Sequence, residues 1–422
     1  MRFVLSSYGT RGEVEPCVAV GRELLARGHE VSMAVPPDLV GFVESAGLAA
    51  VPFTMHSQTL IRPYLNYWTS RYSNFWEVRH RFRLSREVQE TGSRALAETG
   101  TALMSLTDGA DLLLTGVNFE HPAAHVAEHY DIPLATMHFC PVRANGQAFP
   151  ALAAVFGRSV SRAREWLMWL IGTKKIEDAQ RRELGLPKAN GPLSVRMAQR
   201  GSLEIQAYDE ICFPGLATEW AKSGGRRPFV GNLTIELPTE ADEDVSAWIA
   251  AGTPPICFGF GSMRVDSIAE TVTMIAAACA RLGERALICA GVSELDDVSD
   301  FGHVKVVPAV NYAEIFPTCR AVVHHGTSAT AAGLRAGVPT LILWKIPEQR
   351  LWGNTIKRLK VGTARSFFAT TEKSLVTDLS SILETQSVNR AREIAAQMTK
   401  PADCATYAAD LVEQLARVGR AD

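Results

Sequence analysis

Apolar and polar positions in the first fifty residues alternate as they do in a parallel α/β sheet. Short apolar runs predict strands over residues 3–6 and 31–35. Between these strands, a helical period predicts a helix that starts at Pro16 and stops at Gly28, and a second helix is predicted over residues 39–46. Because strands and helices alternate, we expect a parallel sheet with helices on both faces.

The same alternation resumes after a long helical insert. Apolar runs over residues 111–115 and 133–137 predict buried strands on either side of a helix over residues 120–130. A second series of strands is predicted over residues 256–260, 286–290, 304–307, 321–324 and 340–344. We therefore expect an α/β fold of two doubly wound, Rossmann-like domains.

The boundary between the domains is predicted from turn residues. Residues 215–231 contain a run of Gly, Arg and Pro and predict a linker. The amino-terminal domain then covers residues 1–214 and the carboxyl-terminal domain covers residues 232–400. Ligands of open α/β sheets bind at the carboxyl ends of the strands, so the residues that follow each strand are the candidates for a site.

Composition narrows the class of protein. The 422 residues include 43 Lys and Arg and 45 Asp and Glu, a formal net charge of -2. Residues 1–212 hold 22 basic and 22 acidic side chains, so no basic field is available for nucleic acid. Eight cysteines are scattered without CxxC or zinc-ligand spacing, and no apolar run is long enough for a signal peptide or a membrane span. These features predict a cytoplasmic protein with reduced thiols.

The first candidate site follows the predicted strand at 321–324. His324 begins a turn of small and hydroxyl residues that leads into a helix, and a helix amino terminus offers N–H groups and a positive dipole end to a phosphate. A tight turn with two packed histidines is the alternative. Ser262, in the sequence Phe-Gly-Ser-Met after another strand, offers a second hydroxyl. Arg264 stands where a dinucleotide fingerprint needs its third small residue, which disfavours NAD.

Two pairs of polar residues begin helices elsewhere. Glu348 and Gln349 could hydrogen-bond to vicinal sugar hydroxyls, or could serve the helix start alone. Glu13 and Glu15 follow the first strand, where two glycines let a ligand approach the backbone, and one of these carboxylates could be a general base. First-turn acids before Pro16 are the simpler interpretation.

Taken in order, these motifs resemble a known family. Gly-Thr-Arg-Gly-Glu-Val-Glu-Pro at residues 9–16, Phe-Gly-Ser-Met at residues 260–263 and the segment from His324 to Asn354 are similar to bacterial members of glycosyltransferase family 1, in the group that decorates vancomycin-type peptides. The sequences at residues 34–37 and 41–48 resemble those of mycobacterial glycosyltransferases, including those of the glycopeptidolipid type. The resemblance implies a GT-B fold whose two domains face a central cleft, an acceptor-binding domain followed by a nucleotide-sugar-binding domain, and a helix over residues 401–422 that packs toward the amino-terminal domain.

The resemblance also implies a role for each motif. Glu13 matches the position of the catalytic base. The donor sugar would contact Glu348 and Gln349, and the nucleoside base of the donor would contact Val307 and Val310. The diphosphate would contact Ser262, His324, Gly326, Thr327, Ser328, Ala329 and Thr330.

The chain departs from the family pattern at three points. Thr327, Ser328 and Ala329 replace Gly, Ala and Gly of the usual turn, which restricts the backbone and adds two hydroxyl donors. Glu stands for the family's Asp at position 13 and at position 348. A catalytic group misplaced by ~1 Å can cost on the order of 10²-fold in rate. These substitutions therefore leave the identity of the donor sugar undetermined.

The predicted reaction is an inverting transfer without metal or cofactor other than the nucleotide-sugar donor. The donor would be a dTDP- or UDP-sugar carrying a deoxyhexose such as rhamnose, and the acceptor a lipopeptide or related lipid or natural-product hydroxyl. Asp242-Glu243-Asp244 has the form of a metal-binding Asp-x-Asp, but it follows the linker and predicts a solvated turn or helix start.

Acceptor residues are harder to place. Residues 61–86 hold six arginines and seven aromatic residues, among them Trp68 and Trp76. These two residues, together with Tyr8 in the first loop, are predicted to contact the acceptor. Residues 158–175 combine basic residues with the sequence Trp-Leu-Met-Trp-Leu-Ile. Such segments suit a lipid acceptor or the inner face of a membrane, while packed helices with solvated faces are the alternative. A nucleotide-sugar epimerase of the same fold and a catalytically silent nucleotide-binding protein also remain possible.

Overall fold

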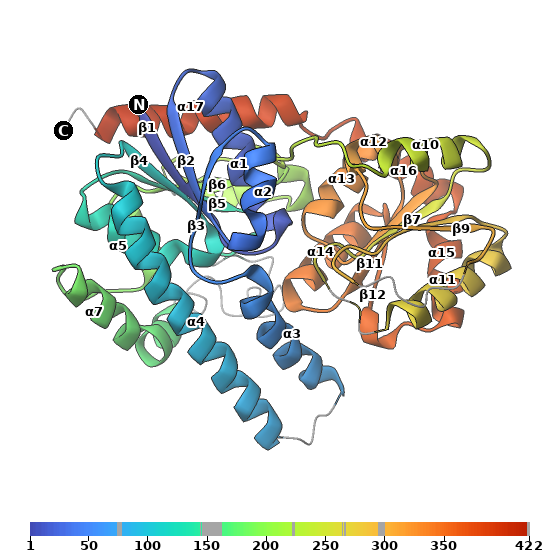
Figure 1. Cartoon of the computed structure of the whole chain (residues 1–422), viewed down its shortest axis with the longest axis horizontal. Coiled ribbons are helices and arrows are strands. Elements are labelled where there is room, and N and C mark those ends of the chain that lie inside the picture. Colours follow the sequence, from blue (N-terminus) through green and yellow to red (C-terminus); the bar gives the residue numbers. More distant parts are fainter. Residues whose placement is uncertain are drawn as a thin grey trace. The chain divides into compact units, whose positions relative to one another are not determined.

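The computed structural model describes residues 1–73, 78–143, 145, 163–221, 224–263, 265, 267–293 and 300–419. It divides into two compact units (Figure 1). Unit 1 comprises Met1–Ile235 and Thr399–Asp422, and unit 2 comprises Glu236–Met398. Within the described ranges, none of the helices combines the length and apolar character that a membrane crossing requires.

The core of unit 1 is a sheet of six parallel strands. In space their order is β3-β2-β1-β4-β5-β6, the doubly wound order in which helices cover both faces. The strands are β1 (Arg2–Ser6), β2 (Glu30–Val35), β3 (Ala49–Pro52), β4 (Leu112–Gly116), β5 (Leu134–His138) and β6 (Leu203–Gln206). Every residue of β4 and β5 is buried, as expected of central strands covered on both faces.

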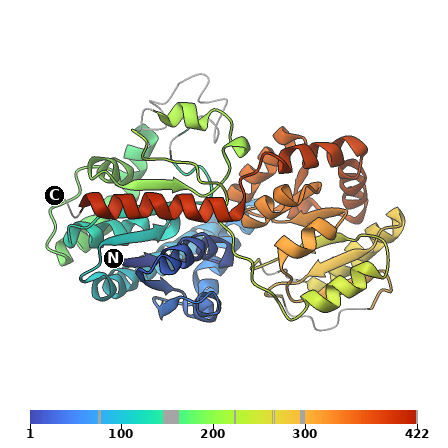
Figure 2. The same cartoon turned by 90° about the horizontal axis from the view of Figure 1, so that it is seen from above.

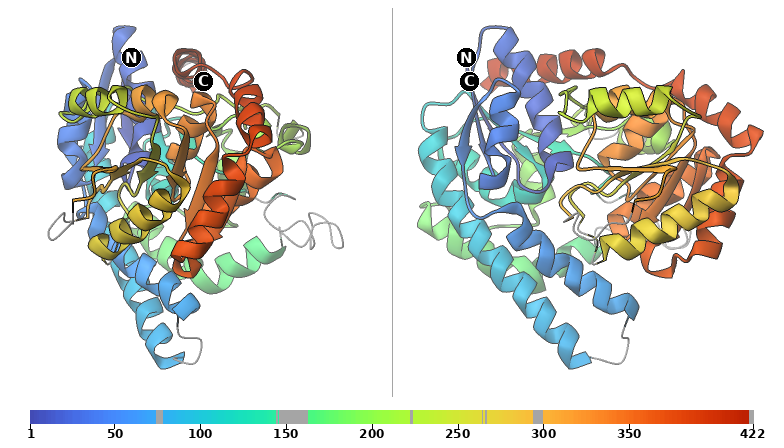
Figure 3. Two further views of the ribbon diagram at one scale, coloured as in Figure 1. Left: turned by 90° about the vertical axis from the view of Figure 1, so that its right-hand side faces the viewer. Right: turned by 45° about the vertical axis from the view of Figure 1, so that its right-hand side comes forward.

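The helices of unit 1 include a long pair that extends from the sheet. The helices are α1 (Arg11–Ala26), α2 (Val40–Ser45), α3 (Ser57–Ser73), α4 (Val78–Thr107), α5 (Glu120–His129), α7 (Lys174–Glu183), α8 (Leu193–Gln199), α9 (Leu216–Trp220) and α17 (Pro401–Gly419). Figures 1 and 3 show α3 and α4 lying side by side and projecting well beyond the strands of unit 1. The helical insert expected from the sequence is this pair.

The carboxyl-terminal helix α17 belongs to unit 1. It lies along the unit and packs against α1 (Figure 2). Arg27, which ends α1, donates to Asp410 at 2.7 Å and to Glu413 at 3.2 Å, and Glu413 also contacts His29 at 2.9 Å. A group of ion pairs therefore holds the last helix on the first one.

Unit 2 repeats the doubly wound arrangement. The order of its six parallel strands is β12-β11-β10-β7-β8-β9. The strands are β7 (Ile256–Gly259), β8 (Ala286–Cys289), β9 (Val304–Val307), β10 (Ala321–His324), β11 (Thr340–Trp344) and β12 (Gly362–Ser366). The helices are α10 (Asp242–Ala250), α11 (Ile268–Leu282), α12 (Tyr312–Ile315), α13 (Ser328–Ala336), α14 (Pro347–Leu359), α15 (Glu372–Ile382) and α16 (Thr385–Ala395). Two apolar clusters pack on the sheet and fill its core.

The start of the first helix differs from the sequence prediction. Pro16 is not the first residue of α1, which begins at Arg11 and carries Pro16 in its second turn. The cap formed by Thr10 and Glu13 starts the helix earlier, and Pro16 removes only one backbone donor near that start. Gly28 does follow the helix, with φ of 82°.

Residues 215–231, the predicted linker, lie inside unit 1. They include α9, whose Trp220 is buried and stacks on Phe229 with ring centroids 6.0 Å apart. Phe229 in turn forms a β-bridge with Gln206 of β6. Because the segment contains apolar side chains that pack on the sheet, the unit continues to Ile235 despite the Gly and Pro turns.

Candidate active site

Each sheet has one point at which the strand order reverses, and ligands of such sheets bind outside the carboxyl ends of the strands there. In unit 1 this point lies between β1 and β4, and in unit 2 between β7 and β10. The loop at residues 7–10 follows β1 at the reversal point of unit 1. The turn at residues 325–327 follows β10 at the reversal point of unit 2. Most of the residues predicted to contact donor or acceptor lie at these two places.

The loop after β1 is fixed on the neighbouring strand β4. A Cβ on Gly116 would lie 2.5 Å from Oγ of Ser7, so glycine is needed for the loop to pack there. Asn118, just after β4, donates from Nδ2 to the carbonyl of Tyr8 at 2.8 Å. The first turn of α1 is thereby held beside the reversal point of unit 1.

Glu13 is the third residue of α1 and its carboxylate turns back to the helix start. Oε2 accepts hydrogen bonds from the backbone N–H and the hydroxyl of Thr10, the latter at 2.6 Å. Gly9, with φ of 141°, permits this fold, since a Cβ there would lie 2.6 Å from the same oxygen. The side chain is partly exposed and lies at the positive end of the helix dipole.

Glu15, the other carboxylate in this loop region, has a structural contact instead. Its Oε1 accepts the backbone N–H of Ile235 at 2.8 Å, at the end of unit 1. Burial raises the pKa of Glu15 above its ordinary value, against the opposing effects of Arg11 and this hydrogen bond. Both carboxylates are partly exposed, but Glu15 is engaged by the backbone at the end of unit 1, so Glu13 is the candidate at the reversal point of the sheet.

The three predicted acceptor contacts have different outcomes. Tyr8 is only 1% exposed, packs between the rings of Phe53 and Phe119, and donates its hydroxyl to the carbonyl of His56. Its side chain is thus part of the core of unit 1, and the acceptor contact stays a prediction that this packing does not favour. Trp68 lies in α3, partly buried, with its ring edge on Tyr67. Trp76 lies outside the described residues.

In unit 2, the turn between β10 and α13 brings together buried histidines. His324 ends β10, is 3% exposed, and accepts the N–H of Gly326 on Nδ1 at 2.9 Å. The proton of its neutral ring therefore sits on Nε2. His325 donates from Nδ1 to the carbonyl of Leu343 at 2.6 Å, which leaves its Nε2 as an acceptor. Burial lowers the pKa of each histidine to about 3, so both rings are neutral near pH 7.

Polar atoms without partners gather around this turn. In the described part of the chain, Nε2 of His324, Nε2 of His325 and Oγ1 of Thr330 are buried with no hydrogen-bond partner. Buried polar atoms in proteins almost always have partners, so such a group needs an explanation, and a bound ligand is one.

Thr327 carries the strain of the altered turn. It is the residue before α13 and has φ of 67° and ψ of -135°, a region that β-branched residues avoid. Its hydroxyl donates to the carbonyl of Gly326 at 2.6 Å, so that proton is engaged within the turn. Ser328 and Ala329 form the first turn of α13, where the N–H groups lack intrahelical acceptors.

The other residues predicted to bind the nucleotide-sugar donor lie along the same edge of the unit 2 sheet. Gly259 pairs with His324 in register, and Ser262 follows three residues later, partly exposed. Val307 ends β9 and Val310 follows it, and both are 6% exposed in an apolar cluster. Their side chains therefore pack inside the unit, and any contact with a nucleoside base involves the backbone of this loop.

Asp242 shows why the Asp-x-Asp sequence differs from a metal motif. Its carboxylate accepts the backbone N–H of Asn311 at 2.8 Å and that of Thr239 at 2.6 Å. Asp244 pairs with Lys305 at 2.6 Å. The predicted helix start is confirmed by α10, but Asp242 is buried rather than solvated. Across the described ranges, no three His, Cys, Asp or Glu side chains are grouped as metal ligands.

Glu348 and Gln349 begin α14 beside the turn. Oε1 of Gln349 accepts the N–H of Lys345 at 2.8 Å, and Gln349 is 3% exposed. A Cβ on Gly326 would lie 3.4 Å from Cα of Gln349, so the turn and this helix start are in contact. Glu348 is partly buried next to Gln349. Unit 2 thus brings the predicted diphosphate and sugar residues together.

Sequence reasoning missed a buried ionic network in unit 1. Glu120 contacts His138 at 2.6 Å and Arg143 at 2.9 Å, and Arg143 also binds Glu204. Burial opposes ionisation of Glu120, but the charges of Arg143 and His138 lower its pKa to about 2. The available signal was His138 at the end of the buried strand β5 and Glu204 within the buried strand β6.

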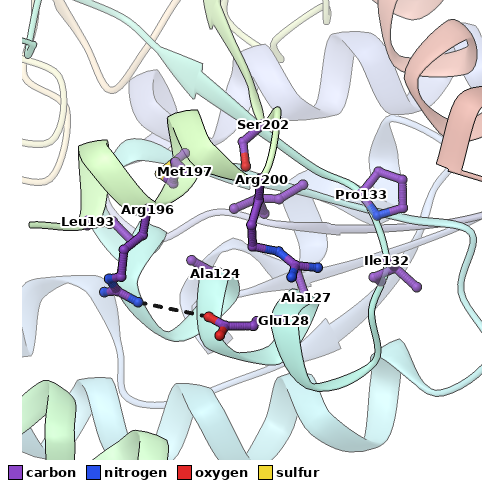
Figure 4. Close-up of a pocket in the computed structure, with 11 residues that line it drawn as sticks. Ala124, Ala127, Glu128, Ile132, Pro133, Leu193, Arg196, Met197, Arg200 and Ser202 are labelled. Carbon is purple, nitrogen blue, oxygen red and sulfur yellow. Dashed lines mark ion pairs between the residues drawn. The ribbon is translucent and has the colours of Figure 1, made fainter. Parts of the chain in front are cut away.

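A small hollow in unit 1 contains none of the predicted residues. Figure 4 shows it between α5 and α8, with Arg196 directed toward Glu128, 4.0 Å away. Arg196 is also bound to Glu177 at 2.9 Å, and Arg200 to Asp131 at 2.8 Å. Since both arginines are paired with carboxylates, the hollow does not compete with the reversal points as a candidate site.

Comparison with known proteins gives consistent matches. Residues 3–148 match the glycosyltransferase family 28 N-terminal domain. An uncharacterized glycosyltransferase of Mycobacterium tuberculosis is 56% identical over 425 residues, covering 100% of this chain and 100% of the relative. The glycosyltransferase VinC in complex with dTDP has a TM-score of 0.64 at 17% identity, covering 99% of this chain and 100% of that chain. The spinosyn rhamnosyltransferase SpnG has the same TM-score and identity and covers 98% and 99%.

Proposed function

Because the chain belongs to the glycosyltransferases, we propose that it transfers a deoxyhexose from a dTDP- or UDP-sugar to a hydroxyl of a lipopeptide or related lipid or natural-product acceptor. The predictions of glycosyltransferase activity and of the GT-B fold are confirmed. The matched domain is that of family 28 rather than family 1. A vancomycin-group enzyme of glycopeptidolipid-type biosynthesis, working in the cytoplasm, remains part of the proposal.

The observation that carries the donor half is the group of partnerless polar atoms at the β10–α13 turn. Neutral Nε2–H of His324 and the hydroxyl of Thr330 are hydrogen-bond donors, and the start of α13 adds backbone N–H groups and a positive dipole end. Together they suit a diphosphate. VinC, a protein of similar fold, binds dTDP, which supports a thymidine nucleotide as the first donor to test.

The sugar would lie at the start of α14. Gln349 uses Oε1 to cap the helix, so its amide group supplies N–H donors to sugar hydroxyls while Glu348 supplies an acceptor. The nucleoside base of the donor would lie over the backbone at Val307 and Val310. SpnG is named a rhamnosyltransferase, which supports rhamnose as one candidate sugar.

Glu13 would act as the base. As the acceptor oxygen bonds to the anomeric carbon, the bond from that carbon to the diphosphate breaks, the hydroxyl proton passes to Glu13, and the configuration inverts. The negative charge that grows on the leaving diphosphate would be stabilised by the donors of the β10–α13 turn. In this proposal no metal or further cofactor is needed.

The test is a panel of dTDP- and UDP-sugars assayed by mass spectrometry against a deglycosylated lipopeptide. A product heavier by one deoxyhexose is expected with a dTDP-sugar, and the free nucleotide should raise the Tm. Conversion of the donor alone to an isomer would indicate an epimerase instead. Nucleotide binding without turnover on a broad set of acceptors would indicate a catalytically silent protein, and either result would overturn the proposal.

A further inference from the structure

Unit 1 carries a concentrated run of exposed apolar side chains between residues 166 and 171. The exposed fractions are 40% for Trp166, 54% for Leu167, 60% for Met168, 52% for Leu170 and 78% for Ile171. They are five of the thirteen exposed large apolar residues in the described part of the chain. Single exposed apolar residues are ordinary, whereas a contiguous group marks a surface that meets another apolar phase.

Trp169 is the one residue of the run 166–171 that is buried, and its contacts show that the exposure of the others is set by the fold. Trp169 is 6% exposed and donates from Nε1 to Glu177 at 3.1 Å. Glu177, itself buried, also binds Arg196 at 2.9 Å, and Lys174 lies over the Trp169 ring at 5.0 Å. The segment is therefore pinned through Trp169, whose ring meets that of Trp166 edge-on with centroids 5.5 Å apart. The exposed side chains that surround this pair are Leu167, Met168, Leu170 and Ile171.

The backbone changes helix type within the run. Residues 163–168 are α-helical, and residues 169–173 form a π-helix that leads into α7. A π-helix adds a residue to the turn and moves the following side chains around the axis. Leu170 and Ile171 consequently join Leu167 and Met168 on the exposed side rather than following Trp169 inward.

Charge around the run favours an anionic surface. Arg164 and Lys175 are exposed on either side of it, and the acidic Glu165 between them accepts a hydrogen bond from Ser194. A second surface of unit 1 has the same chemistry, because Phe82 is 73% exposed among the arginines at the start of α4. Residues 78–86 include four arginines and no carboxylate. Basic residues beside exposed apolar ones are typical of segments that lie in the interface of anionic membranes.

We propose that residues 164–175 form a membrane-docking segment whose run 166–171 enters the interface of an anionic phospholipid bilayer. Trp169 positions the segment, the neighbouring apolar side chains enter the acyl boundary, and Arg164 and Lys175 contact lipid headgroups. The proposal does not depend on the glycosyltransferase donor or acceptor. It concerns how the protein approaches a lipid surface.

The experiment is co-sedimentation of the full chain with vesicles of phosphatidylglycerol and phosphatidylcholine, compared with vesicles of phosphatidylcholine alone. We expect binding to the anionic vesicles that weakens as salt rises. Leu167→Ser combined with Ile171→Ser should reduce the partition coefficient at least about tenfold, because two large apolar side chains no longer enter the interface. Trp169 is left intact, since its removal would disturb the buried contacts with Glu177.

A matched control is Leu25→Ser combined with Val418→Ser, which removes two exposed apolar side chains elsewhere in unit 1. It should bind vesicles like the unchanged protein. The nucleotide-induced rise in Tm is measured on the same samples, so loss of donor binding is detected separately. Absence of binding to anionic vesicles at low salt, or equal binding by the Leu167/Ile171 variant, would overturn the proposal. So would a protein dimer that the same variant dissociates, because the run would then contact a second copy of the chain.

Discussion

Two helix starts, one in each unit, use the same position for different chemistry. Glu13 is the third residue of α1 and Gln349 is the third residue of α14. Each side chain turns back and accepts backbone N–H groups before the helix, as in a capping box. Glu13 carries a carboxyl group and is partly exposed, whereas Gln349 carries an uncharged amide and is 3% exposed.

In the proposed function, this difference would separate a site that accepts a proton from a site that binds an anion. A carboxylate at the edge of unit 1 can accept a proton from a hydroxyl. In unit 2, the equivalent position holds an uncharged amide, and Nε2–H of His324 and the start of α13 present donors. Helix capping alone explains why Glu or Gln is found at this position. Variants must therefore remove the carboxylate while keeping the capping hydrogen bond, and the reverse.

The largest effect is expected from Glu13→Gln. Glutamine can still accept the N–H of Thr10, so the helix start should survive while the proton acceptor is lost. Turnover should fall on the order of 10²- to 10⁴-fold, with unchanged affinity for the free nucleotide. Steady-state kinetics and calorimetry of nucleotide binding would measure the two effects.

Glu13→Ala is the matched comparison, since it removes both charge and cap. It should lose activity to the same extent and in addition lose about 1 kcal/mol of unfolding free energy, which Glu13→Gln should retain. Full activity in Glu13→Gln would exclude Glu13 as the base and leave it a capping residue.

The next effect concerns acid pH and the buried histidines. The pKa values of His324 and His325 are lowered to about 3, chiefly by burial, and the unfolded chain takes up their protons near pH 6.5. Unit 2 should therefore be fully stable above pH 6.5 and lose about 1.4 kcal/mol per histidine for each pH unit below it, until about pH 3. Unit 1 has a corresponding histidine in His125, also with a pKa of about 3.

Hydrogen exchange of strand amides, corrected for intrinsic rates, would compare the two units at pH 7.0 and pH 5.0. Protection of β10 and β11 should fall more than that of β1 and β4, because two histidines act in unit 2 and one in unit 1. The double variant His324→Gln, His325→Gln should flatten the pH dependence of unit 2. An equal loss of protection in both units would show that these histidines do not set the difference.

A smaller effect is expected from Gln349→Leu. The change leaves the buried N–H groups of Lys345 and Ile346 without the side-chain acceptor and should cost about 1–3 kcal/mol in the stability of unit 2. Gln349→Glu keeps an acceptor at the positive helix end, so it should lose less stability. Thermal unfolding would rank the variants. Equal stability of Gln349→Leu and the unchanged protein would remove the capping role.

The central strands could be predicted from the sequence, but of the four edge strands only β9 was, at residues 304–307. Strands β1, β4, β7 and β10 are buried on both faces and appear as apolar runs within one or two residues of the predicted bounds. The edge strands β3, β6 and β12 were not predicted. Three of the four residues of β3 are exposed and all five of β12 are partly exposed, so neither gives a hydrophobic signal. Strand β6 is buried but carries Glu204 and Gln206 in a polar network.

Much of the candidate site was predictable by position but not by side-chain contact. Apolar runs followed by glycine and hydroxyl residues located Glu13, Ser262 and the turn after His324, because ligand loops follow central strands. The same pattern could not reveal that Tyr8 turns into the core. Its burial results from Phe53 and Phe119, which lie about 45 and 111 residues further along the chain and meet it only in the folded unit.

The smallest effect is expected from Thr327→Gly. Glycine adopts φ of 67° without the Cβ clash that threonine carries, and relief of strain of about 1–3 kcal/mol is partly offset by the greater freedom of glycine in the unfolded chain, about 0.5–1 kcal/mol. The variant should unfold at a slightly higher temperature and bind the free nucleotide as before, since the Thr327 hydroxyl already donates to Gly326. Thr327→Ala removes the hydroxyl but keeps the Cβ, so it should not be stabilised. If both variants instead bind nucleotide more weakly, the hydroxyl turns from Gly326 to the diphosphate when the donor binds, and the strained threonine serves the donor site of unit 2 in the way that the charged cap serves unit 1.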